Sequence, residues 1–222
     1  GLTTVLDVKI ATYPTHAASM PVALIPNCAA TRHVDFTLTG DGPALFTPPD
    51  LSLWPQIDGQ GPVGRRLSLD DLSEDVLAEL KSGETLLLSG TLYTGRDAAH
   101  KRMVDTLRAG GDLPLDLNGR ALYYVGPVDA IPGEIIGPAG PTTSTRMDEF
   151  TDEVLAATGL KIMIGKAERG AEAIEAIRRH GAVYMIAVGG AAYLVAQSIK
   201  AARVVAYDDL GMEAIREFTV LD

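Results

Sequence analysis

The sequence predicts an α/β protein with a mainly parallel or mixed β-sheet covered by helices on both faces, preceded by a short segment of strands and loops. Two observations predict this fold class. From residue 120 onward, short apolar runs alternate with amphipathic helical patterns, as in crossover connections between parallel strands. Before residue 67, proline and glycine separate short apolar runs that show no helical period.

Composition and charge limit the classes of function. The chain has 222 residues, of which 46% are hydrophobic and 22% charged, which is typical of a globular protein. A formal net charge of −10 opposes binding to nucleic acid or to anionic membranes, so any anion site must be local. The apolar runs are shorter than the ~20 residues of a membrane span, and the single cysteine cannot form an internal disulfide. We expect a cytoplasmic protein.

Three regions follow from the composition. Residues 1–45 contain short strands and loops, residues 46–66 form a linker rich in proline and glycine, and residues 67–222 form the α/β domain. The chain begins with Gly1 and ends soon after its last strand pattern begins. We therefore expect a fragment of a longer protein, truncated at both ends.

Each element of the α/β domain is predicted from a local pattern. Leucines on one face predict a first helix that ends before Gly83, and Asp97 is available to cap the next one. Apolar runs predict the strands. In order, the elements are helix 68–80, strand 84–90 with either its continuation or a second strand at 91–94, helix 95–108, strand 121–125, helix 143–158, strand 160–164, helix 171–180, strand 183–188, helix 191–200, and strands 203–207 and 218–221.

The stretch from Gly137 to Arg146 is the most distinctive in the sequence. A rigid loop of glycines and prolines runs through four hydroxyl residues into helix 143–158, for which Gly159 is the expected C-terminal cap. Hydroxyl residues cap helix N-termini, and the free amides there attract anions. With Arg146 nearby, this stretch is either a carboxylate or phosphate site or an ordinary capped helix.

Lys166 and Arg96 are candidates for the same edge of the sheet. Lys166 follows an apolar strand and Gly165, and Arg96 precedes a helix. In open α/β sheets, ligands lie beyond the carboxyl ends of the strands. The alternative for both residues is a solvated surface cation. Patterns for a Walker A loop, a dinucleotide fingerprint and a metal-binding cysteine pair are missing from the sequence.

Cys28 and His16 lie in the first region. Cys28 has polar and basic neighbours that would stabilise a thiolate, although a lone cysteine is more often a small buried apolar residue. His16 is either a site residue or a hydrogen-bonded structural histidine.

Several blocks of the sequence together resemble the C-terminal part of the class I, iron–sulfur fumarate hydratases, in the fused single-chain form. The resemblance covers essentially the whole chain in order. The blocks are Pro14-Thr-His-Ala-Ala-Ser19, Ile25-Pro-Asn-Cys-Ala-Ala-Thr-Arg-His33, Thr94-Gly-Arg-Asp-Ala-Ala-His-Lys-Arg102, Gly137-Pro-Ala-Gly-Pro-Thr-Thr-Ser-Thr-Arg-Met-Asp148, Ile164-Gly-Lys-Ala-Glu-Arg-Gly170, Ala187-Val-Gly-Gly-Ala-Ala-Tyr193 and Asp209-Leu-Gly-Met-Glu-Ala-Ile215.

The resemblance implies a function and a site. Members of this family interconvert fumarate and (S)-malate, a reaction of the tricarboxylic acid cycle, with a [4Fe-4S] cluster held by three cysteines. Cys28 matches one of those ligands, and the N-terminal domain that carries the other two is missing, so this fragment alone should be inactive. The resemblance also implies a swivelling β/β/α-type domain in a homodimer. Its substrate-binding residues would be His16, Arg96, Thr142, Thr143, Arg146 and Lys166, with Thr142 and His16 as catalytic residues.

The residue types suit a dicarboxylate substrate. Two arginines and a lysine supply permanent positive charge for two carboxylates, and Thr142 beside these cations is the expected proton-transfer residue. Three alternatives remain. The first is an L-tartrate or mesaconate hydratase of the same family, the second is a non-catalytic α/β module that binds anions, and the third is a scaffold domain.

Overall fold

The computed structural model describes residues 36–37, 40–42, 45–46 and 63–222. Residues 63–222 belong to one compact unit, and the earlier described residues belong to another. In the latter, Phe36–Thr37 (β1) pairs antiparallel with Leu45–Phe46 (β2). The predicted boundaries at residues 45 and 66 stay a prediction.

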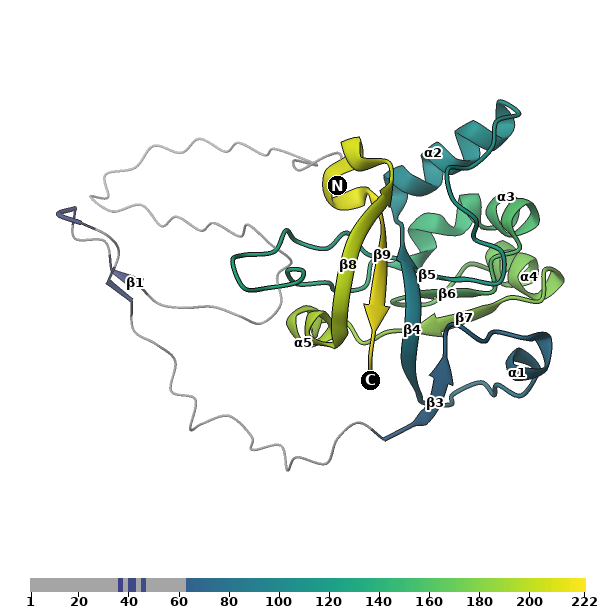
Figure 1. Cartoon of the computed structure of the whole chain (residues 1–222), viewed down its shortest axis with the longest axis horizontal. Helices are drawn as coiled ribbons and strands as arrows, with labels where there is room; N and C mark the ends of the chain where they lie inside the picture. The colour runs from purple at the N-terminus through teal and green to yellow at the C-terminus, as the bar shows by residue number, and fades with distance from the viewer. Residues whose placement is uncertain (1–35, 38–39, 43–44, 47–62) are drawn as a thin grey trace, which may run out of the picture. The chain divides into compact units, whose positions relative to one another are not determined.

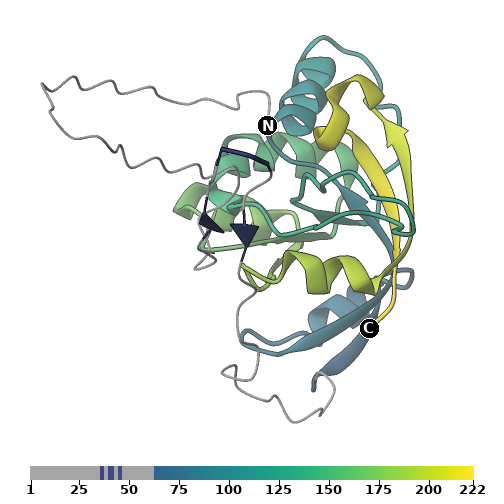
Figure 2. The same ribbon diagram turned by 90° about the vertical axis from the view of Figure 1, so that its left-hand side faces the viewer.

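A mixed seven-stranded sheet forms the centre of residues 63–222 (Figure 1). The five strands β3 to β7 pair in parallel, and β9 and β8 continue the sheet antiparallel beyond β4. Figure 2 shows the β8–β9 pair curving along one side of the domain. The strands in spatial order are β7 (Val183–Ile186), β6 (Ile162–Gly165), β5 (Ala121–Tyr123), β4 (Leu86–Thr94), β9 (Ile215–Val220) and β8 (Ile199–Ala206), and β3 (Arg65–Ser68) pairs with the first half of β4.

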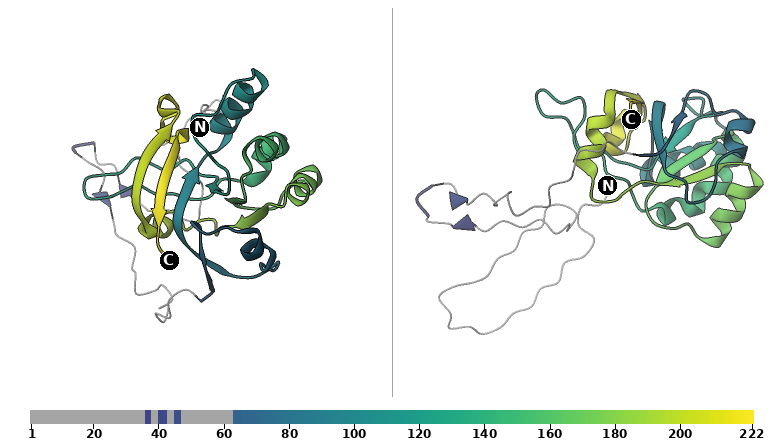
Figure 3. Two further views of the ribbon diagram at one scale, coloured as in Figure 1. Left: turned by 45° about the vertical axis from the view of Figure 1, so that its right-hand side comes forward. Right: turned by 90° about the horizontal axis from the view of Figure 1, so that it is seen from below.

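Helices cover both faces of the sheet, as the sequence predicted. On one face, α2 (Asp97–Arg108), α3 (Asp148–Thr158) and α4 (Ala171–Arg179) lie side by side (Figure 3) and share a core with the sheet. On the other face, α1 (Glu74–Ala78) and α5 (Ala192–Ser198) pack on a second core. Two 3₁₀ turns, η2 (Ser144–Met147) and η3 (Asp208–Glu213), lie before α3 and β9. None of the helices in the described residues is both long and apolar enough to cross a membrane.

The first predicted helix is much shorter than the sequence indicated. Residues 65–68 form β3, and α1 begins only after Ser73, whose Oγ accepts a hydrogen bond from the Val76 amide at 3.3 Å. The leucine spacing resembled a helical period, but Leu67 and Leu69 are buried as part of the strand and the turn after it. Pairing with β4 therefore overrides the local pattern.

Of the two possibilities for residues 91–94, the continuation is confirmed, because Leu86–Thr94 forms a single strand with Gly90 at φ +119°.

The end of the chain differs from the prediction. β9 begins at Ile215 rather than at residue 218. β8 begins at Ile199, a residue that the sequence placed in the last turn of helix 191–200. Antiparallel partners lengthen both strands, because pairing satisfies backbone groups that a helix end would leave unpaired.

Candidate functional site

A segment of threonines fills the gap between two parallel strands where these strands end. The Thr142 amide donates to the Tyr124 carbonyl, which follows β5, at 2.6 Å. The Lys166 amide, just after β6, donates to the Thr142 carbonyl at 3.1 Å, and the Ser144 amide donates to the Lys166 carbonyl at 3.0 Å. Thr143 and Lys166 thus form a parallel bridge. Main-chain hydrogen bonds therefore place Thr142, Thr143 and Lys166 next to one another.

One glycine position, Gly165, makes this close approach possible. A Cβ on Gly165 would lie 2.0 Å from Ser144 Oγ and 2.9 Å from a ring carbon of Tyr124. Ser144 is fully buried, and the Tyr184 hydroxyl lies 2.8 Å from its Oγ while donating to the Ala167 carbonyl at 2.6 Å. Across the loop, a Cβ on Gly189 would only touch the Lys166 side chain, at 3.7 Å. Glycine at 165 is thus a steric requirement of the site.

The threonines and Lys166 keep polar groups available at this edge of the sheet. Thr142 is buried, and its hydroxyl has no hydrogen-bond partner among the described residues. The partly buried Lys166 ammonium likewise has no ion-pair partner within the described part of the chain. An ammonium and a hydroxyl at one edge of the sheet, both unpaired among the described residues, favour an anionic ligand.

The predicted capping of this helix start is wrong in detail. The 3₁₀ turn η2 separates the threonines from α3, and neither η2 nor α3 has a side-chain cap at its start. Two of the amides expected to attract an anion, those of Thr142 and Ser144, already bond to neighbouring strands. The Gly159 prediction is confirmed, because this residue ends α3 in the left-handed conformation at φ +66°. Side chains rather than free amides therefore provide the positive charge.

Arg96 and Arg146 meet at one carboxylate. Asp97 forms an ion pair with Arg146, Nε to Oδ1 at 2.7 Å, and accepts a hydrogen bond from Arg96 Nε at its other oxygen at 3.1 Å. The Arg96 side chain is 15% exposed and lies against Gly126, two residues after Tyr124, whereas that of Arg146 is 50% exposed. Because Arg146 also belongs to η2, the arginines and the threonines lie at the same edge of the sheet.

A carboxylate that the sequence reasoning did not select lies under Arg96. The buried Glu213 lies 3.6 Å from Arg96 Nε and accepts from the Ala98 amide at 2.7 Å, so it caps α2. The sequence suggested Asp97 as this cap, but the N-cap residue is Arg96 and its side chain makes no capping bond. The sequence does carry one signal for Glu213, because it is a lone charged residue within the apolar run from Met212 to Ile215.

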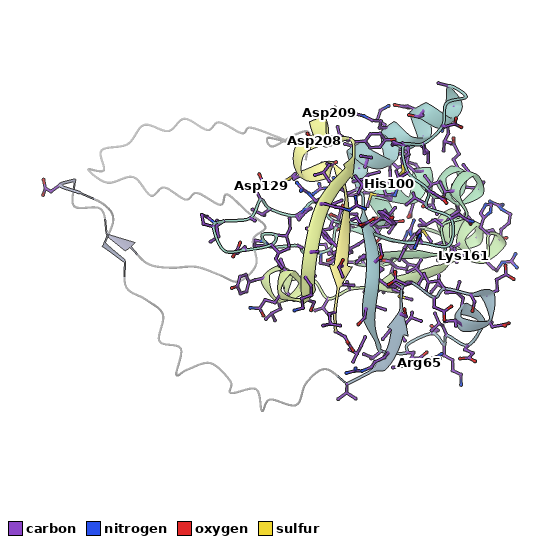
Figure 4. All side chains as sticks on the ribbon, in the orientation of Figure 1. Arg65, His100, Asp129, Lys161, Asp208 and Asp209 are labelled. Carbon is purple, nitrogen blue, oxygen red and sulfur yellow. The ribbon has the colours of Figure 1, made fainter. Side chains whose placement is uncertain are left out.

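His100 is buried directly behind Arg96. Its Nδ1 lies 3.0 Å from the Arg96 carbonyl, and its ring packs edge-on against Tyr124 at 5.2 Å. Burial, with a smaller contribution from the Arg169 charge, lowers the pKa of His100 to about 4. His100 is therefore neutral at pH 7 and donates Nδ1–H to the carbonyl. Figure 4 shows His100 beside α2, at the end of the sheet opposite Arg65.

A second buried network supports the threonine segment. The Arg169 side chain is 1% exposed and donates to Asp148 at 2.6 Å, as well as to Thr151 and to the Tyr124 hydroxyl. Asp148 also accepts from the Gly170 amide at 2.7 Å. The network ties the start of α3 to the loop after Lys166. The sequence did not single out Arg169, because an arginine in a polar loop carries no signal of burial.

Two predicted site residues, His16 and Cys28, lie outside the described residues. Within the residues described, no group of three or more histidine, cysteine, aspartate or glutamate side chains could hold a metal ion. The structure thus brings together Arg96, Thr142, Thr143, Arg146 and Lys166. Their roles stay a prediction.

The sequence of the chain matches two known protein families. Residues 40–222 match the family described as Fumarase C-terminus, and residues 1–37 match the family described as Fumarate hydratase (Fumerase). The chain is 33% identical to the aerobic class I fumarate hydratase of Escherichia coli (strain K12), over 97% of this chain and 41% of that protein. It is 32% identical to a putative class I fumarate hydratase of Geobacillus stearothermophilus, over 100% of this chain and 45% of that protein.

A further relative comes from the tartrate dehydratases. The putative L(+)-tartrate dehydratase subunit beta of Methanocaldococcus jannaschii is 34% identical, over 69% of this chain and 80% of that protein. The present chain thus spans less than half the length of the two fumarate hydratases but most of the length of this subunit.

Proposed function

Because the chain belongs to the Fumarase C-terminus family and is the C-terminal region of a class I fumarate hydratase, we propose that it forms the substrate-binding part of a hydro-lyase that interconverts fumarate and (S)-malate. The arrangement of Arg96, Arg146, Lys166 and the two threonines at the edge of the sheet supports this proposal.

The observation that carries the proposal is a cation and a buried hydroxyl at the same edge of the sheet. Lys166 and Thr142 have no side-chain partners within the described residues, although Thr142 is buried and Lys166 partly so. We propose that one carboxylate of the substrate accepts from the Lys166 ammonium. The second carboxylate of fumarate or malate then binds the guanidinium groups of Arg96 and Arg146, which present several N–H donors each.

Thr142 is the proposed proton-transfer residue of this chain. Two main-chain hydrogen bonds fix Thr142. Its amide donates to the Tyr124 carbonyl, and its carbonyl accepts from the Lys166 amide. A nearby positive charge favours the deprotonated hydroxyl, so the cations at this edge of the sheet would assist removal of a proton from the substrate carbon. His16 is proposed as a further proton-transfer and carboxylate-binding residue from the first region.

An iron–sulfur cluster does not fit the residues of this chain alone. A [4Fe-4S] cluster is held by cysteine thiolates, and this chain contains one cysteine, Cys28. We propose Cys28 as one ligand of such a cluster, with the other thiolates supplied by the longer protein that the relatives represent. The residues described here would bind the substrate and move its proton.

We also propose partners and a cellular location. The partners are the dicarboxylate substrate, the N-terminal part of the protein and a second copy in a homodimer, and the proposed location is the cytoplasm. The 222 residues alone would be inactive, because too few thiolates are present.

A substrate test separates the candidate functions. The full-length protein, purified without oxygen, would be assayed on fumarate, mesaconate and L-tartrate, together with its Lys166→Ala and Arg96→Ala variants. We expect fumarate to be preferred and both variants to lose about 100-fold or more in kcat/KM. Arg178→Ala is the control, since Arg178 pairs only with Glu175 on the exposed face of α4 among the described residues. Wild-type activity in either site variant would contradict the proposal.

L-tartrate dehydration is the second candidate function. The tartrate dehydratase subunit is a relative whose length this chain covers to 80%. Preference for L-tartrate in the same assay would favour it. A non-catalytic anion-binding module is a third outcome, which a Cys28→Ala protein that kept its iron and its activity would support.

A further inference from the structure

Asp97 is an acidic residue at a site proposed for acidic ligands. Its two oxygens each lie against a different arginine, Arg146 Nε at 2.7 Å and Arg96 Nε at 3.1 Å. Together with Glu213, it places two carboxylates beside two arginines. Such a carboxylate reduces the attraction of the site for anions, so attraction does not explain its position.

The contacts of Asp97 leave the outer ends of both arginines available. A guanidinium has five N–H donors, and Asp97 lies closest to the Nε atom of each arginine. Among the described residues, no hydrogen bond uses the four donors on the terminal nitrogens of either guanidinium. A ligand carboxylate can therefore bind the terminal nitrogens of both arginines while Asp97 pairs with their Nε atoms.

Arg146 depends on Asp97 more than Arg96 does. Arg96 is also fixed by Glu213 at 3.6 Å and by Gly126, where a Cβ would lie 3.0 Å from Arg96 Cδ. Arg146 is half exposed, and Asp97 is its only ion-pair partner among the described residues. A free arginine side chain has up to ~2 kcal/mol of rotamer entropy to lose on binding. Holding it in advance removes part of that cost.

We infer that Asp97 is a positioning residue, which bridges Arg96 and Arg146 so that both guanidinium groups face one carboxylate of a dicarboxylate substrate. This inference rests on the proposed function. An asparagine at position 97 has a single acceptor oxygen, and its amide nitrogen cannot accept from a guanidinium. Asp97→Asn therefore releases one of the two arginines while the size of the side chain is kept.

The kinetic test compares Asp97→Asn with Asp209→Asn in the full-length protein, purified without oxygen. Asp209 is the matched control, because it accepts two hydrogen bonds from Arg102 of the same helix, at 2.6 and 2.8 Å. We expect Asp97→Asn to lower kcat about tenfold or more and to change KM by less than about threefold, because the lost charge repulsion offsets the lost orientation. Asp209→Asn should keep both constants within about twofold.

A kcat for Asp97→Asn that stays within twofold of wild type would overturn the inference, and so would an equal loss in Asp209→Asn. If Asp97→Asn does not fold, as judged by circular dichroism, Asp97→Glu takes its place. It keeps the charge but moves the carboxylate, so it should also lower kcat, and unchanged kinetics would overturn the inference.

A binding test separates this inference from the proposed function. Calorimetry would compare succinate with propionate, which has one carboxylate less, on the wild-type protein and on Asp97→Asn. We expect wild type to prefer succinate, and Asp97→Asn to reduce that preference about fivefold or more. If the protein binds succinate in this way but does not hydrate fumarate, the proposed function fails and the inference stands. An unchanged preference, or no succinate binding by wild type, overturns the inference.

Discussion

The two halves of the candidate site are held in place by different parts of the chain. In the threonine–lysine half (Thr142, Thr143 and Lys166), main-chain hydrogen bonds of 2.6 to 3.1 Å fix the residues between two strands. In the arginine half (Arg96 and Arg146), side-chain ion pairs to Asp97 fix the guanidinium groups. In the first half Thr142 is buried and Thr143 and Lys166 are partly buried, whereas the second half reaches solvent through Arg146.

The difference determines how each half responds to change. Backbone hydrogen bonds remain when a side chain loses its charge, so the threonine–lysine half is sensitive mainly to steric substitutions. An exposed ion pair is weakened by salt and depends on one partner. The arginine half is therefore the part of the site that a single carboxylate can tune.

The largest expected effect breaks the threonine–lysine half. Gly165→Ala would place a Cβ 2.0 Å from Ser144 Oγ, which is too close to be relieved without moving the threonine segment. We expect a loss of about 3 kcal/mol in the free energy of unfolding, measured with urea. Gly189→Ala is the control, since its Cβ would make an ordinary contact at 3.7 Å. Equal stability of the two variants would show that the gap between the strands is looser than described.

The second effect concerns the buried histidine behind the arginine half. The pKa of His100 is lowered to about 4 in the folded protein, against ~6.5 in the unfolded chain. Because the unfolded state binds more protons between these values, stability falls as the pH drops from 6.5 to 4. Arg169 and Asp97 are the charged groups that face the ring.

Measuring the free energy of unfolding at pH 7 and pH 5 tests this linkage. We expect wild type to lose about 2 kcal/mol more over this range than His100→Asn, which keeps a donor for the Arg96 carbonyl but does not titrate. Parallel losses in the two proteins would mean that folding does not lower the pKa of His100.

The smallest expected effect tests whether a side chain helps to position the threonine–lysine half. Tyr184→Phe removes the hydroxyl that bonds to the Ala167 carbonyl and contacts Ser144 Oγ, so about 1 kcal/mol of stability should be lost. Succinate affinity should stay within twofold of wild type, because main-chain bonds hold Lys166. Tyr193→Phe, at an exposed position on α5, serves as the control. A tenfold loss of affinity in Tyr184→Phe would show that side chains position this half as well.

Much of the fold could be predicted from the sequence, because its signals are local. Apolar runs marked β5, β6 and β7, and Gly159 marked the end of α3. The predictions were wrong where distant partners decide. Residues 65–68 form a strand because β4 pairs with them, and Ile199 begins β8 because β9 pairs with it.

The candidate site shows the same division. Arg96, Thr142, Thr143, Arg146 and Lys166 could be selected from motifs, because their residue types and places before helices or after strands are visible in the sequence. Glu213 and Arg169 could not be selected. Their importance comes from burial against residues 115 and 45 positions away, Ala98 and Tyr124.

The sequence by itself determined the order of strands and helices from β4 to β9, the family and the set of cations at the edge of the sheet, since each depends on residue type and short-range spacing. Only the tertiary structure decided which donors remain free. It uses the amides of Thr142 and Ser144 between strands, leaves the Lys166 side chain unpaired within the described residues, and sets Asp97 between two arginines. The physical reason is that hydrogen bonds and ion pairs form between groups close in space, and their separation along the chain does not reveal them.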